Sequence, residues 1–254
     1  MNLNKTVLIT GASSGIGKEL AYVYAKKSYN LILVARRIDN LNSIKTDIEA
    51  SYNVNVQNIQ TDLSLKESAD LLFDKVKDKN IDILINNAGF GINGNFKDID
   101  IEQETDMLML NMVTLTRLTK LFANKMLKSN GGNIVNISST AAFQGIPTFA
   151  AYAATKAYVL HFTEALSIEF KNTNVNFTAI CPGATQSEFM ETANVKNVKF
   201  LKMPTSKQVA EYTYKAVLNN KTVAVHGTIN RFLVFMSRFS PRKINTYIAA
   251  KIFD

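Results

Sequence analysis

The sequence of 254 residues predicts an α/β protein with a doubly wound, mainly parallel sheet of about seven strands and helices on both faces. Strand-like and helix-like stretches alternate along the whole chain, which indicates successive βαβ units. The strand-like stretches, such as L-I-L-V-A at Leu31–Ala35, are almost continuously apolar, and this suits strands that helices cover on both faces. A glycine-rich turn between the first strand and the first helix is the third observation.

Strands and helices follow one another in a regular order. The strands are expected near Thr6–Thr10, Leu31–Ala35, Val56–Gln60, Ile83–Asn86, Asn133–Ile137, Asn176–Ile180 and Val223–Val225. The helices are expected near Ile16–Lys27, Asp39–Ser51, Leu65–Asp78, Ile101–Lys128, Ala151–Lys171 and Ser206–Asn219. No linker, repeat or low-complexity tract interrupts this order, so residues 1–254 are expected to form a single domain of Rossmann type. The apolar stretch 150–166 contains Lys156, His161 and Glu164, so it is expected to be a buried helix rather than a membrane span.

The first strand, K-T-V-L-I-T at Lys5–Thr10, leads into the turn G-A-S-S-G-I-G and then into a helix. Glycine lets the backbone turn tightly and approach a pyrophosphate closely, and a helix start offers free N–H groups to an anion. The expected phosphate-binding residues are Gly11, Ser13, Ser14, Gly15, Ile16 and Gly17. The spacing is G-x-x-x-G-x-G, and the alternative is a helix-capping turn whose glycines are incidental.

Two arginines follow the second strand. Dinucleotide-binding folds commonly place an acidic residue at this point, where it binds the ribose 2′-hydroxyl of NAD. Arg36 occupies the position instead, and Arg37 comes next. Guanidinium groups bind a phosphate in bidentate fashion, whereas a carboxylate repels one, so the sequence predicts NADP(H). The alternative is two exposed arginines that open a loop.

A tyrosine and a lysine lie four positions apart in the helix-like segment Y-A-A-T-K, Tyr152–Lys156. Residues at this spacing share one helix face, and a neighbouring cation lowers the pKa of a phenol. The pair can therefore give and take a proton near neutrality. Ser139, thirteen positions before Tyr152, could hold a substrate carbonyl next to the phenol. The alternative is a buried tyrosine and a solvated lysine on one helix.

Seven segments together carry a family resemblance. In order, they are T-G-A-S-S-G-I-G (Thr10–Gly17), T-D-L (Thr61–Leu63), N-N-A-G (Asn86–Gly89), Asn111, I-V-N-I-S-S (Ile134–Ser139), Y-A-A-T-K (Tyr152–Lys156) and P-G-A-T-Q-S (Pro182–Ser187). On these segments, and over nearly its whole length, the chain resembles the classical short-chain dehydrogenase/reductase family. The segment N-N-A-G-F-G-I-N-G-N-F and the basic C-terminal tail resemble, to a lesser degree, the bacterial members known as DltE-like.

The resemblance implies a role for each of four catalytic residues. Ser139 would polarise the substrate oxygen, and Tyr152 would be the general acid in reduction. Lys156 would lower the Tyr152 pKa and hold the nicotinamide ribose, while Asn111 would anchor a water molecule in a proton relay. Besides the glycine-rich turn and the two arginines, the residues expected to bind the cofactor are Asp62, Leu63, Asn87, Ala88, Gly89, Asn111, Tyr152, Lys156, Pro182, Gly183, Thr185 and Ser187.

Two regions are expected to shape the substrate pocket. The resemblance implies that residues 184–201 form a mobile lid, and this segment carries Phe189, Met190 and Phe200. The loop residues expected to point the same way are Phe90, Phe96, Phe143, Ile146 and Phe149. An apolar pocket for a carbonyl compound with a hydrophobic body follows, and the alternative is ordinary loop packing.

The C-terminal tail, residues 230–254, combines basic residues with a run of apolar ones. It could cover the substrate pocket, form a subunit contact or touch an anionic membrane surface. Packing on the chain's own fold or on another subunit is favoured over lipid.

Composition narrows the class of protein. The single cysteine excludes an intramolecular disulfide and, with only two histidines, predicts no metal site. Residues 1–5 lead directly into a strand without a signal peptide, so a cytoplasmic location is expected. The net charge of +8 suits a cofactor with several phosphates as well as nucleic acid or anionic lipid. No block of five like charges occurs, and we expect neither a nucleic-acid partner nor integral membrane association.

Together these observations predict an NADP(H)-dependent oxidoreductase that transfers a hydride between nicotinamide and a carbonyl or hydroxyl substrate. The favoured interpretation is a carbonyl reductase acting on an apolar ketone, aldehyde or 3-oxoacyl compound. One alternative is an alcohol or sugar dehydrogenase in the oxidative direction. The other is a non-catalytic NADP(H)-binding regulator, against which the four intact catalytic residues argue. The resemblance and the apolar surface of the two long helices imply a homodimer or homotetramer.

Overall fold

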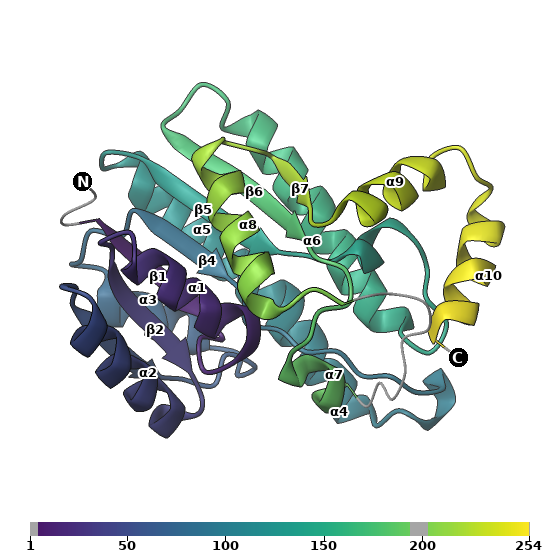
Figure 1. Ribbon diagram of the computed structural model, residues 1–254, viewed down its shortest axis with the longest axis horizontal. Coiled ribbons are helices and arrows are strands. Elements are labelled where there is room, and N and C mark those ends of the chain that lie inside the picture. The colour runs from purple at the N-terminus through teal and green to yellow at the C-terminus, as the bar shows by residue number, and fades with distance from the viewer. Residues whose placement is uncertain (1–4, 194–202, 254) are drawn as a thin grey trace.

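The structure is a computed structural model that describes residues 5–193 and 203–253 (Figure 1). Its centre is a seven-stranded sheet in the order β3-β2-β1-β4-β5-β6-β7, and all neighbouring strands run parallel. The strands are β1 Thr6–Thr10, β2 Asn30–Ala35, β3 Val56–Gln60, β4 Ile83–Asn86, β5 Gly132–Ile137, β6 Val175–Cys181 and β7 Val223–Val225. The doubly wound α/β prediction is confirmed, and each predicted strand end agrees with the structure to within one residue.

Helices cover both faces of this sheet. The α-helices are α1 Gly15–Ala25, α2 Ile38–Ser51, α3 Ser68–Val76, α4 Ile101–Leu108, α5 Leu115–Leu127, α6 Ala150–Glu169, α7 Glu188–Thr192, α8 Ser206–Leu218, α9 Thr228–Ser237 and α10 Arg242–Phe253. Short 3₁₀ turns occur at Phe96–Asp98 and Thr140–Phe143. Among the described residues, no helix is both long enough and apolar enough to cross a membrane.

Alternate residues of the central strands enter two separate hydrophobic layers. On β1, Val7 and Ile9 pack in the layer that contains Tyr24 of α1, whereas Leu8 packs in the layer that contains Phe122 of α5. All five side chains are fully buried. Because both sides of the strand face helices, its sequence is apolar at successive positions rather than at every second one.

The stretch predicted as one helix, residues 101–128, is interrupted. A π-helix at Met109–Thr114 separates α4 from α5. The wider turn leaves the apolar pattern of the surrounding helix almost unchanged, so the sequence pattern does not reveal it. The prediction of one regular helix is therefore wrong at this point, which is also where Asn111 lies.

The strand order places a crevice at one edge of the sheet. After β1 the chain turns through α1 to β2 on one side, and after β4 it turns through α4 and α5 to β5 on the other. The loops at the carboxyl ends of β1 and β4 therefore diverge, and ligands of open α/β sheets bind at this kind of switch point.

Candidate active site

A cavity of about 480 Å³ lies at this crevice. Its wall includes the glycine-rich turn with Arg36 and Arg37, and also Ser139, Tyr152 and Lys156. Other predicted residues on the wall are Asp62, Leu63, Asn87, Ala88, Gly89, Pro182, Gly183, Thr185 and Ser187. Of the predicted site residues, only Gly17 and Asn111 do not line the cavity, because both are buried behind its wall.

The glycine-rich turn depends on glycine at three points. Gly11 and Gly15 have φ angles of +64° and +53°, in the left-handed region that side chains disfavour. A Cβ atom at Gly17 would lie 2.3 Å from the Gly11 carbonyl oxygen, so only glycine lets α1 start this close to the turn. Ser14 precedes α1 without capping it through its side chain, which leaves first-turn N–H groups for an anion.

Thr10 and Asn87 fasten this turn to the next strand of the sheet. The Thr10 hydroxyl accepts hydrogen bonds from the backbone N–H groups of Asn87 and Ala88, each at 3.0 Å. The Asn87 amide in turn donates to the carbonyl oxygens of Thr10 and Gly11 at 2.9 and 3.1 Å. These bonds join the carboxyl ends of β1 and β4, and they fix the floor of the crevice.

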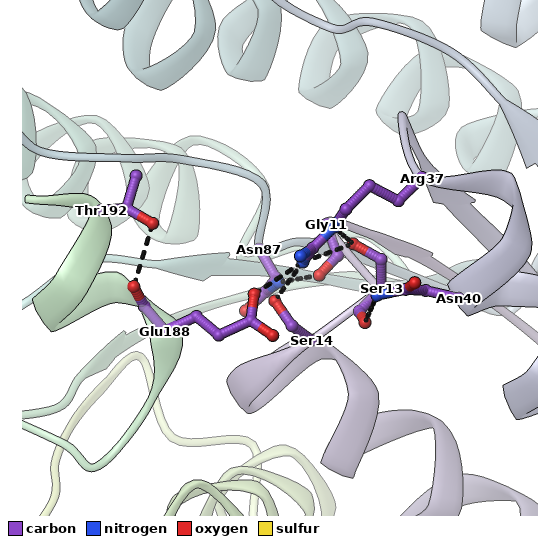
Figure 2. A network of polar contacts seen from close by, with 8 residues as sticks. All are labelled: Gly11, Ser13, Ser14, Arg37, Asn40, Asn87, Glu188 and Thr192. Carbon is purple, nitrogen blue, oxygen red and sulfur yellow. Dashed lines mark hydrogen bonds and ion pairs between the residues drawn. The ribbon is translucent and has the colours of Figure 1, made fainter.

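Arg37 is at the centre of a polar network that Figure 2 shows. Its Nη2 atom donates to the Ser14 hydroxyl at 2.8 Å and forms an ion pair of 2.8 Å with the Glu188 carboxylate. Its guanidinium also reaches the Ser13 hydroxyl at 3.2 Å. The pairing with Arg37 lowers the pKa of Glu188. Helix α7 is thus tied to the glycine-rich turn by a residue that follows β2.

Arg36 is held much less tightly. Its closest acidic neighbour is Asp62, at 3.8 Å, and its side chain is 69% exposed. Because it lines the cavity with most of its surface open, Arg36 is the better placed of the two arginines to receive a phosphate group.

Three of the four predicted catalytic side chains converge on one part of the wall. Lys156 is buried on α6 and donates to the Ile137 carbonyl oxygen at 2.9 Å, while its Nζ atom lies 5.6 Å from the centre of the Tyr152 ring. The Ser139 hydroxyl, at the start of a 3₁₀ turn after β5, accepts a hydrogen bond from the Ala141 N–H group at 3.1 Å. It also donates to the Pro182 carbonyl oxygen at 3.4 Å.

Burial is the main influence on the pKa values of Tyr152 and Lys156. It raises the pKa of Tyr152 to about 12, although the hydrogen bond with Ser139 acts in the opposite direction. It also lowers the pKa of Lys156 to about 8. The expectation that Lys156 brings the Tyr152 phenol near neutrality is therefore not met by the protein's own groups, because burial is the dominant influence on the phenol and only the hydrogen bond with Ser139 opposes it. The raised pKa keeps the phenol protonated, which is the form that a general acid needs.

Asn111 lies in the π-helix, and both the nitrogen and the oxygen of its buried side-chain amide form hydrogen bonds. It donates to the Phe90 carbonyl oxygen at 2.9 Å and to the Thr155 hydroxyl at 3.1 Å, and its oxygen accepts from the Phe90 N–H group at 3.2 Å. Asn111 therefore joins the loop after β4 to helix α6 beside Lys156. The predicted water relay stays a prediction, and the visible role of this side chain is to position the loop.

The other part of the cavity is apolar. Phe90, Phe143, Ile146, Phe149, Phe189 and Met190 line it as predicted. Phe96 does not line it: its side chain is 72% exposed on the turn at Phe96–Asp98, so this prediction is wrong. The predicted lid begins with α7, whose Phe189 ring lies 5.3 Å from the Tyr152 ring. Phe200 and positions 194–201 of that lid lie outside the described residues.

Several parts of the site were not predicted from the sequence. Gly91 is one: a Cβ atom there would lie 3.0 Å from Cδ2 of Tyr152 and 2.9 Å from Cζ of Phe189. Glu188 is another, because its partner Arg37 is 151 positions away. Helix α9 is the third, with Asn230, Leu233, Val234 and Ser237 on the cavity wall. The spacing of these four residues, three or four positions apart, could have indicated a helix face.

The described residues contain no group of side chains that resembles a metal centre. No group of three or more histidine, cysteine or acidic side chains that could hold a metal ion occurs in residues 5–193 and 203–253. Cys181 is buried, and burial raises the pKa of its thiol to about 12, which agrees with the role of a small core residue.

Comparisons with known proteins agree with this architecture. The family model described as short chain dehydrogenase matches residues 5–197. The NADP-dependent 3-hydroxy acid dehydrogenase of Schizosaccharomyces pombe is 31% identical over 237 residues, which cover 89% of this chain and 91% of that protein. The ketoacyl reductase HetN of Nostoc sp. is 29% identical over 250 residues, or 95% and 87% of the two chains. The structure of a short-chain dehydrogenase from Sphingobium yanoikuyae in complex with NADPH superposes with a TM-score of 0.84 and 30% identity, covering 92% of this chain and 94% of that one.

The family match spans most of the sequence, and the fold and the convergence of Ser139, Tyr152 and Lys156 agree with it. The chain therefore belongs to the short-chain dehydrogenase/reductase family, and it is an oxidoreductase that acts on alcohol and carbonyl groups.

Proposed function

We propose that the protein is an NADP(H)-dependent carbonyl reductase that acts on an apolar ketone, aldehyde or 3-oxoacyl compound. One observation carries the proposal: a single cavity joins two arginines and a glycine-rich turn to Ser139, Tyr152 and Lys156. The S. pombe relative is named as NADP-dependent, the Nostoc relative as a ketoacyl reductase, and the Sphingobium structure contains NADPH. These names support the proposal for the present chain.

The cavity fits a nicotinamide dinucleotide. Glycines in the turn leave space that a Cβ atom would fill, and the start of α1 leaves N–H groups free to bind a pyrophosphate. The guanidinium group of Arg36 is largely unpaired and could bind the 2′-phosphate. The residues that would hold the cofactor are the predicted ones on the wall. When bound, the nicotinamide supplies or accepts the hydride.

The protein's own groups would position the substrate and handle the proton. Ser139 donates a hydrogen bond to the substrate oxygen, and the neutral Tyr152 phenol gives its proton to that oxygen in reduction. Lys156 stays close to Tyr152 because its Nζ atom is fixed to the Ile137 carbonyl oxygen. Phe149, whose ring centroid lies 5.6 Å from that of Tyr152, and Phe189 exclude water and contact the apolar body of the substrate.

The direction of the reaction defines a second candidate function. The S. pombe relative is named as a dehydrogenase, which favours an enzyme that oxidises a hydroxyl group. Rates measured in both directions, with a panel of carbonyl compounds and NADPH and with the matching alcohols and NADP⁺, distinguish the two. The carbonyl reductase is expected to show the larger kcat/KM with the carbonyl panel.

The cofactor preference tests the proposal most directly. We expect wild-type kcat/KM to be higher with NADPH than with NADH, and Arg36→Asp to reverse this preference, because a carboxylate repels the 2′-phosphate and accepts from the ribose hydroxyl. Loss of one charge-assisted hydrogen bond corresponds to about tenfold or more in affinity. Lys171→Asp, at an exposed position, is the matched charge control. A wild-type preference for NADH, or an unchanged ratio in Arg36→Asp, contradicts the proposal.

We also infer a cytoplasmic homodimer or homotetramer formed through the outer faces of α5 and α6. Leu127 and Ile168 expose large apolar side chains there. Light scattering coupled to size exclusion tests it, and a monomer mass at micromolar concentration contradicts it. The similarity to DltE-like members stays a prediction.

A further inference from the structure

Helix α9 turns an apolar face to solvent. Phe232, Phe235, Met236 and Phe239 are all exposed, with Phe232 at 62% and Phe239 at 71%. Their spacing of three or four residues places them on one side of the helix. The opposite side, with Asn230, Val234 and Ser237, lines the cavity. The exposed side is thus the more hydrophobic one, which reverses the usual arrangement of a surface helix.

Helix α10 also carries exposed apolar side chains. Ile244, Tyr247 and Ile248 are exposed, with Tyr247 at 68%, and Figure 1 shows both helices in yellow at the edge of the molecule beyond β7. We call this surface the C-terminal platform and define it by six residues. They are Phe232, Phe235, Phe239, Ile244, Tyr247 and Ile248.

The platform is fixed to the body of the protein. The Asn245 amide donates to the Ser237 carbonyl oxygen at 3.0 Å, which ties α10 to the end of α9. Ala249 is fully buried in the cluster that also contains Ile146 and Phe149 of the apolar pocket. The exposed apolar side chains therefore project from an ordered scaffold rather than from a fraying end.

The charge around the platform is mostly positive. Residues 229–254 contain five basic residues, all exposed, and one acidic residue, Asp254. The basic residues are Arg231, Arg238, Arg242, Lys243 and Lys251. Within the described part of the chain, none of the five forms an ion pair with an acidic side chain. The platform therefore offers apolar contact area together with an excess of positive charge.

This combination discriminates between possible occupants. In a two-fold contact between copies, the same patch meets itself, so the five cations of one copy would face those of the other, with Asp254 as the single acidic residue of the segment to offset them. The surface of an anionic lipid bilayer supplies the missing phosphates, and its headgroup region accepts exposed phenylalanine and tyrosine rings. We propose that the C-terminal platform docks the protein on anionic lipid membranes as a peripheral protein.

The platform adjoins the cavity. Leu233 lines the cavity and is also 49% exposed on the outside of α9. Docking therefore places one wall of the cavity against the lipid headgroups. The docking itself is independent of the proposed catalytic function and can be measured without a substrate.

Vesicle co-sedimentation tests the proposal with the full chain. Wild type is expected to sediment with vesicles of mixed phosphatidylcholine and phosphatidylglycerol, less so at high salt, and not with phosphatidylcholine alone. Arg238→Gln/Lys243→Gln is expected to weaken binding by about twenty-fivefold, since each lost cation corresponds to about fivefold. Phe232→Ser/Phe239→Ser is expected to abolish it. Leu71→Ser/Leu218→Ser, at exposed apolar positions on α3 and α8, is the matched control and is expected to bind as wild type does.

Circular dichroism melting shows whether each variant is folded. NADPH titration of the same samples measures cofactor binding independently of vesicle binding, so a failure of the proposed function can be distinguished from a failure of the docking. Equal sedimentation with neutral vesicles, or unchanged binding in the two platform variants, overturns the proposal. The proposal is also overturned if the wild type does not bind vesicles but forms an oligomer. Dissociation of that oligomer by Phe232→Ser/Phe239→Ser, measured by light scattering, would show that the platform is a contact between copies.

Discussion

Tyr152 is the residue whose side chain the proposed chemistry requires as proton donor. Its side chain is partly buried, and the phenol remains protonated because this burial raises its pKa to about 12. Tyr152→Phe removes the hydroxyl while keeping the ring between Phe149 and Phe189. We expect kcat to fall by about 10²–10⁴-fold with NADPH binding intact, as measured by steady-state kinetics and cofactor titration. Retention of more than about a tenth of the activity contradicts a tyrosine acid.

Gly91 is a second residue with a specific expected effect, and it depends on space rather than on charge. A methyl group there would press on the Tyr152 and Phe189 rings, at 3.0 and 2.9 Å. Gly91→Ala should therefore displace the phenol and lower kcat/KM by about tenfold or more, since small misplacements of reacting groups are costly. Gly94→Ala, whose closest neighbour would be an Ile99 carbon at 3.4 Å, is the control. Equal activity of the two variants would show that the ring moves aside freely.

At the scale of elements, the Arg37–Glu188 ion pair connects α7 to the cofactor end of the cavity. Glu188 adds a negative charge beside the turn that would bind the phosphates, and it occupies Arg37. Glu188→Gln should therefore raise NADPH affinity severalfold and NADH affinity less, because it removes repulsion and frees a guanidinium. Titration with both cofactors measures this. Glu191→Gln, on the same helix but outside the cavity wall, is the control, and equal effects of the two substitutions would contradict the expected role of the ion pair.

At the scale of the whole molecule, the buried Lys156 ammonium makes stability depend on pH. Its pKa falls from 10.5 to about 8 on folding, so between these values the unfolded chain binds more protons and stability rises with pH. Relative to Lys156→Met, the wild-type free energy of unfolding should increase by up to about 3 kcal/mol as pH rises through this window. Urea unfolding at several pH values measures it, with the exposed Lys171→Met as control. A difference that stays constant or decreases with pH contradicts the expected cost of burying this charge.

The sequence alone determined the sheet, its parallel strands and the residues on most of the cavity wall. Successive apolar residues define strands buried on both faces, and glycines or a tyrosine–lysine spacing indicate local geometry, so short-range patterns suffice for the strands, the glycine-rich turn and the Tyr152–Lys156 pair. Most other wall residues, such as Asp62 and Pro182, followed from the resemblance to the short-chain dehydrogenase/reductase family. The π-helix at Met109–Thr114 was not predictable in this way, because one altered turn barely changes the apolar pattern. Helices α9 and α10 were not predicted, although the apolar residues of α9 recur at helical spacing; that this apolar face lies toward solvent is visible only in the structure.

Only the tertiary structure decided how the site residues act on one another. Arg37 meets Glu188 across 151 positions, and Gly91 meets the rings of Tyr152 and Phe189, because strand order brings these loops to one crevice. The acidity of Tyr152 and Lys156 was decided at the same level. Spacing on a helix predicts their proximity, but burial by the surrounding chain sets the direction of both pKa shifts, and desolvation is a property of the packed molecule rather than of a motif.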